Sequence, residues 1–369
     1  MLISHLHLQN YRNYQEVELD FSPSINIFLG ENAQGKTNLL ESLYVLALTK
    51  SHRTNNEKEL IYFKEKEARL TCEVVKQTGK VPLEIRFTPK GRRGKVNHIE
   101  QKKLSQYIGK LNVILFAPED LELVKGTPSV RRKFLDMEIS QVSPIYLYDL
   151  VQYQRLLKQR NQYLKQTAFE KRTLDELYLD ILDEQLAEYG EKILQVRREF
   201  VQKLEKFASV LHANISNQKE KLHLEYHSTI KEDSDYLSQL KNARKKDVKH
   251  FSTSVGIHRD DLLFFVNELD VASFGSQGQQ RTTALSVKLA EIDLMYDETG
   301  EYPLLLLDDV MSELDNERQL HLLEAIQGKA QTFITTTTLK HLENLDVVAQ
   351  IFEIEQGAVK DKQEEEHEE

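Results

Sequence analysis

Cysteine is nearly absent from this sequence, since its 369 residues include only Cys72. One cysteine cannot form a disulfide within a chain, and such sparse use is typical of a reducing compartment. Long apolar stretches are lacking too, because none approaches the roughly 18 residues that a membrane-spanning helix needs. The opening residues, MLISHLHLQNYRNY, do not have the basic and then apolar order of a secretion signal. These absences predict a cytoplasmic protein with no membrane partner.

An excess of positive charge is also missing. Lysine and arginine number 49 against 59 aspartates and glutamates, for a formal net charge of -10, and the pI is about 5.7. Proteins that bind nucleic acids are usually basic, so the average argues against such a partner. The distribution changes this conclusion, because residues 131–250 have a net charge of +3 and the rest of the chain has -13. A polyanion could therefore bind the middle of the chain.

Apolar periodicity divides the chain into an α/β part and a helical part. Residues 1–125 and 251–357 alternate short apolar strands with helical patterns, whereas residues 126–250 are mainly helical. Apolar residues recur at steps of three and four across Thr173–Ile215, and Ile145–Leu164 is a plausible antiparallel partner. A bundle packing on itself is favoured over an oligomerising coiled coil, which stays open. We predict one α/β domain split around a helical insertion.

Several elements of the α/β part can be placed individually. Arg69–Val75, Leu83–Thr88 and Lys95–Ile99 alternate in polarity and predict an antiparallel meander. Tyr302–Leu307 predicts a fully apolar strand, and Glu313–Ile326 predicts a single helix after it.

A phosphate-binding loop follows the apolar strand Ser24–Leu29. Gly30–Thr37 reads GENAQGKT, which fits G-x-x-x-x-G-K-[ST] at every fixed position, and a helical pattern comes next. In such a loop, glycines let backbone N–H groups surround phosphates, the lysine reaches the β- and γ-phosphates, and the hydroxyl binds Mg²⁺. A chance glycine-rich turn is the weaker alternative. The residues predicted here to bind ATP and Mg²⁺ are Gly30, Asn32, Gly35, Lys36, Thr37 and Asn38.

Two acids end a strand far along the chain. Leu304–Leu307 are four consecutive leucines, as in a parallel strand buried on both faces, and Asp308 and Asp309 follow them. Asp308 is predicted to hold Mg²⁺ with Thr37, and Asp309 to orient or deprotonate the attacking water. With Lys36, these carboxylates are the predicted catalytic residues. Lys36 and Asp308 are 272 residues apart, which matches ABC-type ATPases whose head is split around a helical arm.

A third element resembles the signature loop of ABC-type ATPases. Ser273–Arg281 reads SFGSQGQQR before a helical pattern, and Ser276, Gly278 and Gln279 match that signature. In that superfamily the loop binds the γ-phosphate held by the other subunit, through a serine hydroxyl, a glycine amide and a helix N-terminus. An ordinary N-cap at Ser276 is the alternative for this loop alone. Ser312–Asp315 (SELD) further resembles the D-loop of these ATPases.

With these elements, the chain resembles the RecF family of DNA replication and recombination-repair ATPases. The matching segments are Asn10–Tyr14 (NYRNY), Pro118–Asp136, His258–Asp261 (HRDD) and Asp308–Asp315. The resemblance runs from about residue 1 to 357, with Thr127 as a mild departure. It implies an ABC-type P-loop ATPase head, similar to the heads of chromosome-maintenance proteins and split around a mainly helical inserted domain. Residues 358–369 are predicted to form a disordered acidic tail.

The resemblance also implies an activity and its partners. ATP bound at Lys36 of one subunit would be capped by Ser276 of another, so that ATP drives a head-to-tail homodimer. The closed dimer would bind double-stranded DNA and single-strand/double-strand gap junctions in the bacterial nucleoid. With RecR and RecO it would help to load RecA during repair and the SOS response. Slow, DNA-stimulated ATP hydrolysis would reset the dimer.

Two further residues are candidates for the nucleotide site. Arg12 follows the first strand and could contact phosphate or stack on adenine, with a surface salt bridge as the alternative. Thr336 ends the strand after the acidic one, where many ABC-type ATPases have a switch histidine, and His341 comes several residues late. A threonine at the position of the switch histidine predicts slow ATP hydrolysis. Asp309 predicts the same, because it is a shorter base than the glutamate that transporter ATPases have at this position.

Basic residues are scattered over several candidate DNA-contacting surfaces. A single cluster of basic residues usually forms only a solvated surface. Several clusters together could line one surface of a closed dimer and contact the DNA backbone without sequence preference. The candidates are Lys50, Arg53, Arg92, Arg93, Arg131, Arg132, Arg244, Lys245 and Lys246. His258–Asp261 could line an interface or form a buried ion-pair cluster, and both interpretations stay open.

Two other functions remain open on the sequence. A transporter-type ABC ATPase subunit would need a membrane partner, and the helical insertion argues against it. A P-loop kinase acting on a small molecule would leave the loop around Ser276 unexplained.

Overall fold

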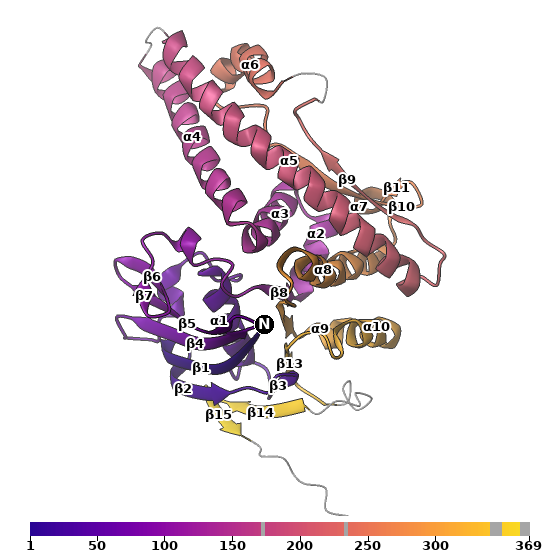
Figure 1. The fold of residues 1–369 in the computed structure, drawn as a ribbon. Helices are drawn as coiled ribbons and strands as arrows, with labels where there is room; N and C mark the ends of the chain where they lie inside the picture. The colour runs from indigo at the N-terminus through magenta and orange to yellow at the C-terminus, as the bar shows by residue number, and fades with distance from the viewer. Residues whose placement is uncertain (171–173, 232–234, 340–348, 362–369) are drawn as a thin grey trace, which may run out of the picture. The chain divides into compact units, whose positions relative to one another are not determined.

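The computed structural model describes residues 1–170, 174–231, 235–339 and 349–361. They form two compact units (Figure 1). The described residues of Met1–Asp120 and Lys288–Glu369 make one, called the head unit, and those of Leu121–Val287 make the other, called the arm unit. The sequence placed the second boundary at residue 251. The structure places it after Val287 because β10 (Asp261–Val266) pairs with β9 (Leu222–His227) of the arm unit.

A mainly parallel sheet forms one layer of the head unit, in the order β15-β14-β3-β13-β12-β8. All neighbours are parallel except β14 and β15. Leu304–Leu307 in β12 are fully buried, which confirms the buried parallel strand predicted there. The strands are β3 (Ile25–Leu29), β8 (Val113–Phe116), β12 (Leu304–Asp308), β13 (Thr332–Thr336), β14 (Ala349–Glu355) and β15 (Ala358–Asp361).

An antiparallel sheet, in the order β2-β1-β4-β5-β6-β7, forms a second layer of the head unit. The predicted meander is confirmed, but the strand expected at Lys95–Ile99 is wrong. Asn97 and His98 have φ of 50° and 64° and turn the chain between β6 and β7, a left-handed conformation that asparagine and histidine adopt more readily than most residues. The strands are β1 (Leu2–Tyr11), β2 (Tyr14–Asp20), β4 (Ala68–Lys76), β5 (Gly79–Thr88), β6 (Gly91–Val96) and β7 (Ile99–Glu100).

Helix α1 (Lys36–Leu48) packs between the two sheets, because it contacts β12 and β13 as well as β4 and β5. Every residue from Leu39 to Leu48 is buried, which explains why the helix is apolar around most of its circumference. Helices α9 (Val310–Glu313) and α10 (Asn316–Ile326) replace the single helix predicted at Glu313–Ile326. The break occurs where the Asp315 side chain caps α10. Short 3-10 helices lie at Glu57–Leu60, Leu104–Gln106 and Pro118–Asp120.

A C-terminal hairpin contradicts part of the predicted disordered tail. Glu355 of β14 pairs with Ala358 of β15, so that Gln356 and Gly357 form a two-residue loop. Both loop residues have positive φ, 49° and 77°, as a type I′ hairpin turn requires. Residues 358–361 therefore form a strand, and the rest of the predicted tail, 362–369, lies outside the described residues.

Helices α4 (Pro144–Phe169) and α5 (Glu176–Ile215) lie side by side in the arm unit (Figure 1). In the apolar stripe predicted across Thr173–Ile215, Leu186, Ile193 and Leu204 are fully buried. Leu177 and Ile181 of the same stripe are exposed instead. Because α5 packs against α4, α6 and β9, the stripe is used within the unit, as the bundle interpretation predicts. The other helices of the arm unit are α2 (Leu121–Lys125), α3 (Pro128–Val142), α6 (Tyr236–His250) and α7 (Val271–Phe274). Helix α8 (Gln277–Thr299) begins in the arm unit and belongs to the head unit from Lys288 onward.

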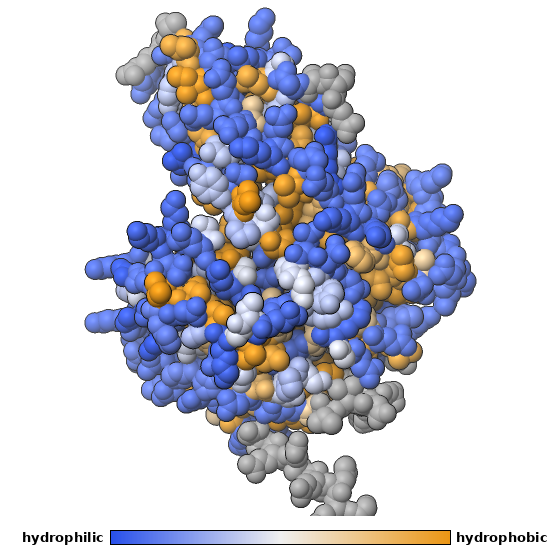
Figure 2. Space-filling model, in the orientation of Figure 1, coloured by the Kyte–Doolittle hydropathy of each residue, from blue (hydrophilic) through white to orange (hydrophobic). Residues whose placement is uncertain are grey.

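A three-stranded antiparallel sheet, β11-β10-β9, completes the arm unit, with β11 at Leu269–Asp270. The face of the molecule seen in Figure 2 is mostly hydrophilic, with separate smaller hydrophobic areas. Throughout the described part of the chain, each helix is too short or too polar to serve as a membrane span.

Buried charges link three helices of the arm unit. Arg160 of α4 is fully buried, and its Nε donates to Asp183 of α5 at 2.6 Å. Its Nη1 donates to Asp247 of α6 at 2.8 Å, and both aspartates are fully buried as well. Each of these charges depends on its partners, since removing one member of a buried ion pair leaves the other uncompensated.

Replacing this buried arginine should destabilise the arm unit. We expect Arg160→Met to lower the free energy of unfolding by about 3–5 kcal/mol, because Asp247 stays buried without its cation and Asp183 keeps only Arg244 of its two arginine partners. Urea denaturation followed by circular dichroism measures the loss. Lys192→Met is the control, since Lys192 and its partner Glu188 are exposed and should contribute little. Equal losses in the two variants would contradict the prediction.

Candidate nucleotide-binding site

The loop from Gly30 to Gly35 joins the end of β3 to the start of α1, as the P-loop pattern predicts. A side chain at Gly30 would overlap the carbonyl oxygen of Ile354. Gly35 has a φ of 116°, and a Cβ there would lie 2.5 Å from Asn13 Nδ2. Packing and backbone conformation therefore both require glycine. Asn32 is exposed on this loop.

Lys36 folds back over the loop that precedes it. Its Nζ donates to the carbonyl oxygens of Gly30 at 2.5 Å and of Glu31 at 2.7 Å. Burial lowers the pKa of Lys36, against the attraction of Asp309 and Asp308. Main-chain oxygens thus hold the ammonium group inside the loop, and phosphate oxygens can replace them as charged and stronger acceptors.

Asp308 ends β12 beside the first turn of α1. The hydroxyls of Thr37 and Thr335 both donate to Asp308 Oδ1, each at 2.9 Å. Hydroxyl and carboxylate oxygens suit Mg²⁺, and about 2.9 Å separates two adjacent ligands of an octahedron with bonds of about 2.0–2.1 Å. Thr37 and Asp308 therefore fit the magnesium site that the sequence predicts.

Asp309 follows on the same strand end but points outward. It has a φ of 54° and is exposed, and its N–H donates to Thr335 Oγ1 at 2.9 Å. Asp308 is therefore buried at the strand end, whereas the carboxylate of Asp309 is open to solvent. An exposed carboxylate next to the metal-binding position is nevertheless accessible to water, as the predicted base must be.

Thr336 ends β13 next to the loop. Its carbonyl accepts from Gly30 N at 3.3 Å, and its hydroxyl donates to the carbonyl of Thr338 at 2.8 Å. A direct contact of Thr336 with nucleotide stays a prediction. The hydroxyl of Thr335 instead contacts Asp308 and the backbone N–H of Asp309. The sequence did not indicate this role of Thr335. His341 lies outside the described residues.

Arg12 pairs with a buried glutamate of α1. Its Nε and Nη2 donate to the two oxygens of Glu41 at 2.8 and 2.7 Å. Tyr11 and Ser51 also donate to Glu41, whose side chain is fully buried. Burial would raise the pKa of Glu41, but the hydrogen bonds from Arg12 and Ser51 hold that pKa below its usual value. The alternative salt bridge is thus present and largely buried, whereas contact of Arg12 with nucleotide stays a prediction.

Asn38 belongs to a small network beside the loop. Its Nδ2 donates to Asn13 Oδ1 at 2.8 Å, and its Oδ1 accepts from Arg53 Nη1 at 2.9 Å. Asn13 in turn donates to the carbonyl of Gln34 at 3.3 Å. The NYRNY segment therefore supports the P-loop through Asn13, a role that the spacing of the motif did not indicate.

The signature loop lies in the arm unit at the start of α8. Ser276 N donates to Gln279 Oε1 at 2.9 Å, and Gln279 N donates to Ser276 Oγ at 3.2 Å. This reciprocal pair is a capping box, so the N-cap interpretation of Ser276 is confirmed as local structure. Ser276 and Gly278 are exposed. The exposed start of a long helix is also suited to bind an anion, so the cap does not exclude the signature role.

The His258–Asp261 segment forms a buried network within the arm unit. Asp260 is fully buried and accepts hydrogen bonds from residues of and after β9. Asp261 pairs with Arg131 at 2.7 Å, and burial lowers the pKa of His258 to about 4. These contacts favour the ion-pair cluster over an interface with DNA or nucleotide.

Two of the basic residues predicted to contact DNA are held by carboxylates instead. Arg131 is 7% exposed and bound by Asp261, and Arg244 pairs with Asp180 and Asp183. The structure therefore assigns Arg131 and Arg244 roles in the packing of the arm unit.

The other basic candidates are nearer to solvent. Lys50 and Arg132 are half-buried, and Arg53, Lys245 and Lys246 are exposed. Arg92 and Arg93 form ion pairs with acidic neighbours at 3.0 and 3.3 Å. Surface pairs of this kind are weak and can be exchanged for phosphate.

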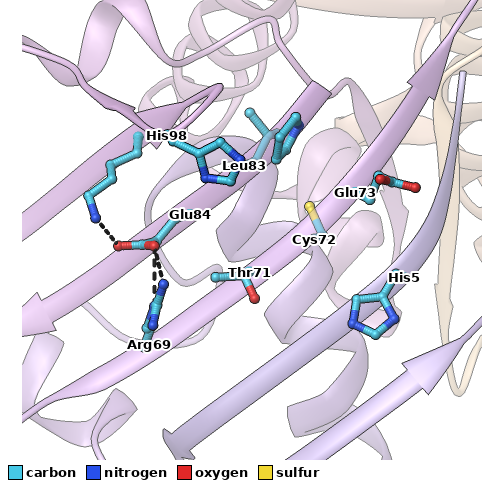
Figure 3. A pocket seen from close by; sticks show the side chains of 10 residues that line it. His5, Arg69, Thr71, Cys72, Glu73, Leu83, Glu84 and His98 are labelled. Carbon is cyan, nitrogen blue, oxygen red and sulfur yellow. Dashed lines mark hydrogen bonds and ion pairs between the residues drawn. The ribbon is translucent and has the colours of Figure 1, made fainter. Parts of the chain in front are cut away.

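A pocket of about 250 Å³ lies on the antiparallel sheet of the head unit (Figure 3). Glu84 lies between Arg69 and Lys95, at 2.7 and 2.9 Å from their nitrogens. Glu73 and the buried Cys72 also line the pocket. Since its two carboxylates balance its two cations, the pocket has no net charge to attract a nucleotide, and none of the predicted site residues lines it.

Comparison with known proteins agrees with this geometry. A family model described as an AAA ATPase domain matches residues 1–336. The DNA replication and repair protein RecF of Enterococcus faecalis is 62% identical over 370 residues, covering 97% of this chain and 98% of its own length. The corresponding protein of Lactococcus lactis subsp. lactis is 53% identical over 363 residues, covering 98% and 100%.

Solved structures give the same assignment. The recombination mediator protein RecF-ATP in the RecFOR pathway matches with a TM-score of 0.89 at 36% identity, covering 98% of this chain and 97% of that one. An Smc head domain from Pyrococcus furiosus matches with a TM-score of 0.57 at 17% identity, covering 97% and 95%, which shows the fold alone.

The P-loop, the buried strand ending in Asp308 and the fold shared with Smc heads define an ABC-type ATPase head. Within that class, the chain belongs to the RecF family of DNA replication and repair ATPases. Membership in this family replaces the transporter-subunit and kinase interpretations.

The pair between Arg12 and Glu41 gives the head unit a pH dependence. Because the pKa of Glu41 lies below its ordinary 4.5, its contribution to stability is present above about pH 4.5 and is lost as the pH falls through the lowered value. Arg12→Met should cost about 3–5 kcal/mol at pH 7. In the variant, burial raises the pKa of Glu41, so the cost should shrink as the pH falls from 7 to 4. Urea unfolding across this range measures it, and a constant difference would contradict the prediction.

Proposed function

We propose that the chain is an ATP-gated DNA-binding protein of recombinational repair and replication-fork maintenance. ATP and Mg²⁺ bind at Gly30–Thr37, a second copy closes over the γ-phosphate with Ser276, and the resulting dimer holds duplex DNA. The observation that carries this proposal is the contact of Asp308 with Thr37 at 2.9 Å. It brings the acid that ends β12 to the first turn of the P-loop helix. Membership in the RecF family supports the rest.

The head unit supplies the groups that ATP needs. Phosphate oxygens can replace the two carbonyl partners of Lys36, and the N-terminus of α1 adds backbone N–H groups with the positive end of the helix dipole. Thr37 and Asp308 would hold Mg²⁺, which supplies positive charge to the β- and γ-phosphates. The solved relative described as RecF-ATP supports ATP as the nucleotide.

A second copy of the chain is the proposed partner for the γ-phosphate. Ser276 is exposed, and the helix that it caps has its N-terminus directed to solvent. A hydroxyl and a helix N-terminus together bind a phosphate well. Head-to-tail pairing would let each copy cap the ATP of the other, as in the superfamily that the signature resembles.

Hydrolysis is proposed to be slow and to reset the dimer. Asp309 would accept a proton from the attacking water, and Thr335 holds its backbone in the left-handed conformation that turns the carboxylate outward. Thr336 takes the position of the switch histidine. DNA would accelerate this step by favouring the closed dimer.

Exposed lysines of α6 are the proposed backbone contacts to DNA. Lys245 and Lys246 lie on this helix with Lys249, which is also exposed. Contacts of this kind bind without sequence preference and weaken as salt rises. Gap junctions are the proposed site, with RecR and RecO as partners that load RecA. The solved relative described as a recombination mediator in the RecFOR pathway supports this placement.

Removing the P-loop charge tests the proposal. Lys36→Met should stay monomeric with ATP and should bind duplex DNA no better than the wild-type protein does without ATP, because the β- and γ-phosphates lose their cation. Sedimentation with ATP and duplex DNA over a salt series measures both effects. Lys329→Met is the control, since Lys329 forms a partly exposed pair with Asp293 in the head unit. Undiminished ATP-dependent DNA binding by Lys36→Met would count against gating by ATP.

A further inference from the structure

Glu220 joins the signature loop to the longest helix of the arm unit. It lies in the segment between α5 and β9, and its side chain is 21% exposed. Its Oε1 accepts from Gln279 Nε2 at 2.9 Å, and its Oε2 lies 3.1 Å from His212 Nε2. One carboxylate therefore contacts α8 through Gln279 and α5 through His212. No motif in the sequence marks this glutamate.

The amide of Gln279 is oriented from both ends. Its Oε1 accepts from Ser276 N at 2.9 Å, while its Nε2 donates to Glu220. An ionised carboxylate accepts hydrogen bonds and cannot donate them, so Glu220 selects the nitrogen end of the amide. The oxygen end must then face Ser276. Without Glu220, the amide could rotate away from the cap.

This orientation decides what the hydroxyl of Ser276 can do. Ser276 Oγ accepts from Gln279 N at 3.2 Å. A hydroxyl has one hydrogen to donate, and accepting this bond leaves that hydrogen available. Because Ser276 is exposed at the start of α8, its hydroxyl is placed to donate to an anion that approaches the helix N-terminus.

His212 supports the carboxylate from the other side. The imidazole is fully buried, and burial lowers the pKa of His212, so the neutral ring donates from Nε2 to Glu220. Its Nδ1 lies 3.3 Å from Ser286 Oγ, which is also on α8. Seven residues separate Gln279 from Ser286, or about 10.5 Å along a helix. The Ser286 hydroxyl donates its hydrogen to the carbonyl of Thr282 at 2.7 Å, so its contact with the imidazole is one of packing. The hydrogen bonds through Glu220 therefore hold α8 in its first turn.

We propose that Glu220, supported by His212, is a positioning residue for recognition of the γ-phosphate by the Ser276 loop. Glu220 fixes the Gln279 amide, the amide fixes the cap, and the cap presents the Ser276 hydroxyl. The ligand is the terminal phosphate of a nucleotide bound to a second copy of this chain. The inference rests on the proposed ATP-dependent dimer, which it deepens by naming what orders the loop.

Hydrogen exchange in the nucleotide-free protein tests the positioning role separately from the dimer. In Glu220→Ala, backbone amides of residues 273–281 should exchange about tenfold faster, the effect of losing one charge-assisted hydrogen bond. Glu220→Gln has one oxygen for the two donors, Gln279 and His212, so its exchange should lie between those of the wild type and Glu220→Ala. Glu225→Ala is the matched control, because Glu225 is an exposed carboxylate on the adjacent strand β9. Wild-type exchange rates in Glu220→Ala would overturn the positioning role.

Nucleotide-driven dimerisation tests the consequence. Glu220→Ala should need about tenfold more ATP to dimerise. Glu220→Gln should recover part of the loss, and the ATP affinity of the monomer should not change in either variant. Gln279→Ala should show a similar loss, and the double variant should be little worse than either single one. Additive losses, or wild-type dimerisation by Glu220→Ala, would overturn the link to phosphate recognition. A wild-type chain that stays monomeric with ATP would instead overturn the proposed function, while faster exchange would still support the positioning role.

Discussion

The hydrogen bonds from Thr37 and Thr335 to one oxygen of Asp308 join segments that lie 271 and 27 residues from it in the sequence. They bring the start of α1 and the ends of β12 and β13 to one edge of the parallel sheet. The strand order allows this, because β13 lies between β3 and β12. Four buried leucines hold β12 in the sheet, so its terminal carboxylate stays at the edge where phosphate and metal can reach it.

The arm unit depends on polar contacts of a different kind. Arg160 joins α4 to α5 and α6, Asp261 joins β10 to Arg131 of α3, and Glu220 joins α8 to α5. Such networks stabilise a structure only when every partner is present, and they then specify one arrangement of the helices. A rigid arm unit would favour binding of a phosphate by the loop around Ser276. A loop that is already ordered in the folded protein loses less conformational entropy when it binds a ligand.

The sequence could predict the parts of the site whose chemistry is local. A phosphate-binding loop constrains residues that are neighbours in the sequence, so the roles of Gly30, Gly35 and Lys36 can be predicted from their spacing. The position of Asp308 can be predicted because the four leucines before it indicate a buried strand. The glutamates that bind Arg12 and Gln279 could not be predicted from the sequence. The chain has 59 acidic residues, and the packing of the folded chain determines which of them lies beside each side chain. The domain boundary predicted near residue 251 differs from the one in the structure, after Val287, for a related reason. An alternating strand such as β10 does not show which sheet it will join.

The most direct test of ATP-dependent, head-to-tail dimerisation mixes two variants that each lack one half of the site. Ser276→Arg should block the capping of a partner's ATP, and Lys36→Met should block nucleotide binding in its own loop. A mixture can form one complete site from the intact loop of the first chain and the intact signature of the second. Sedimentation with ATP should therefore show dimers in the mixture that neither variant forms alone. Dimers of Ser276→Arg alone, at the ATP concentration that suffices for the wild type, would contradict the account.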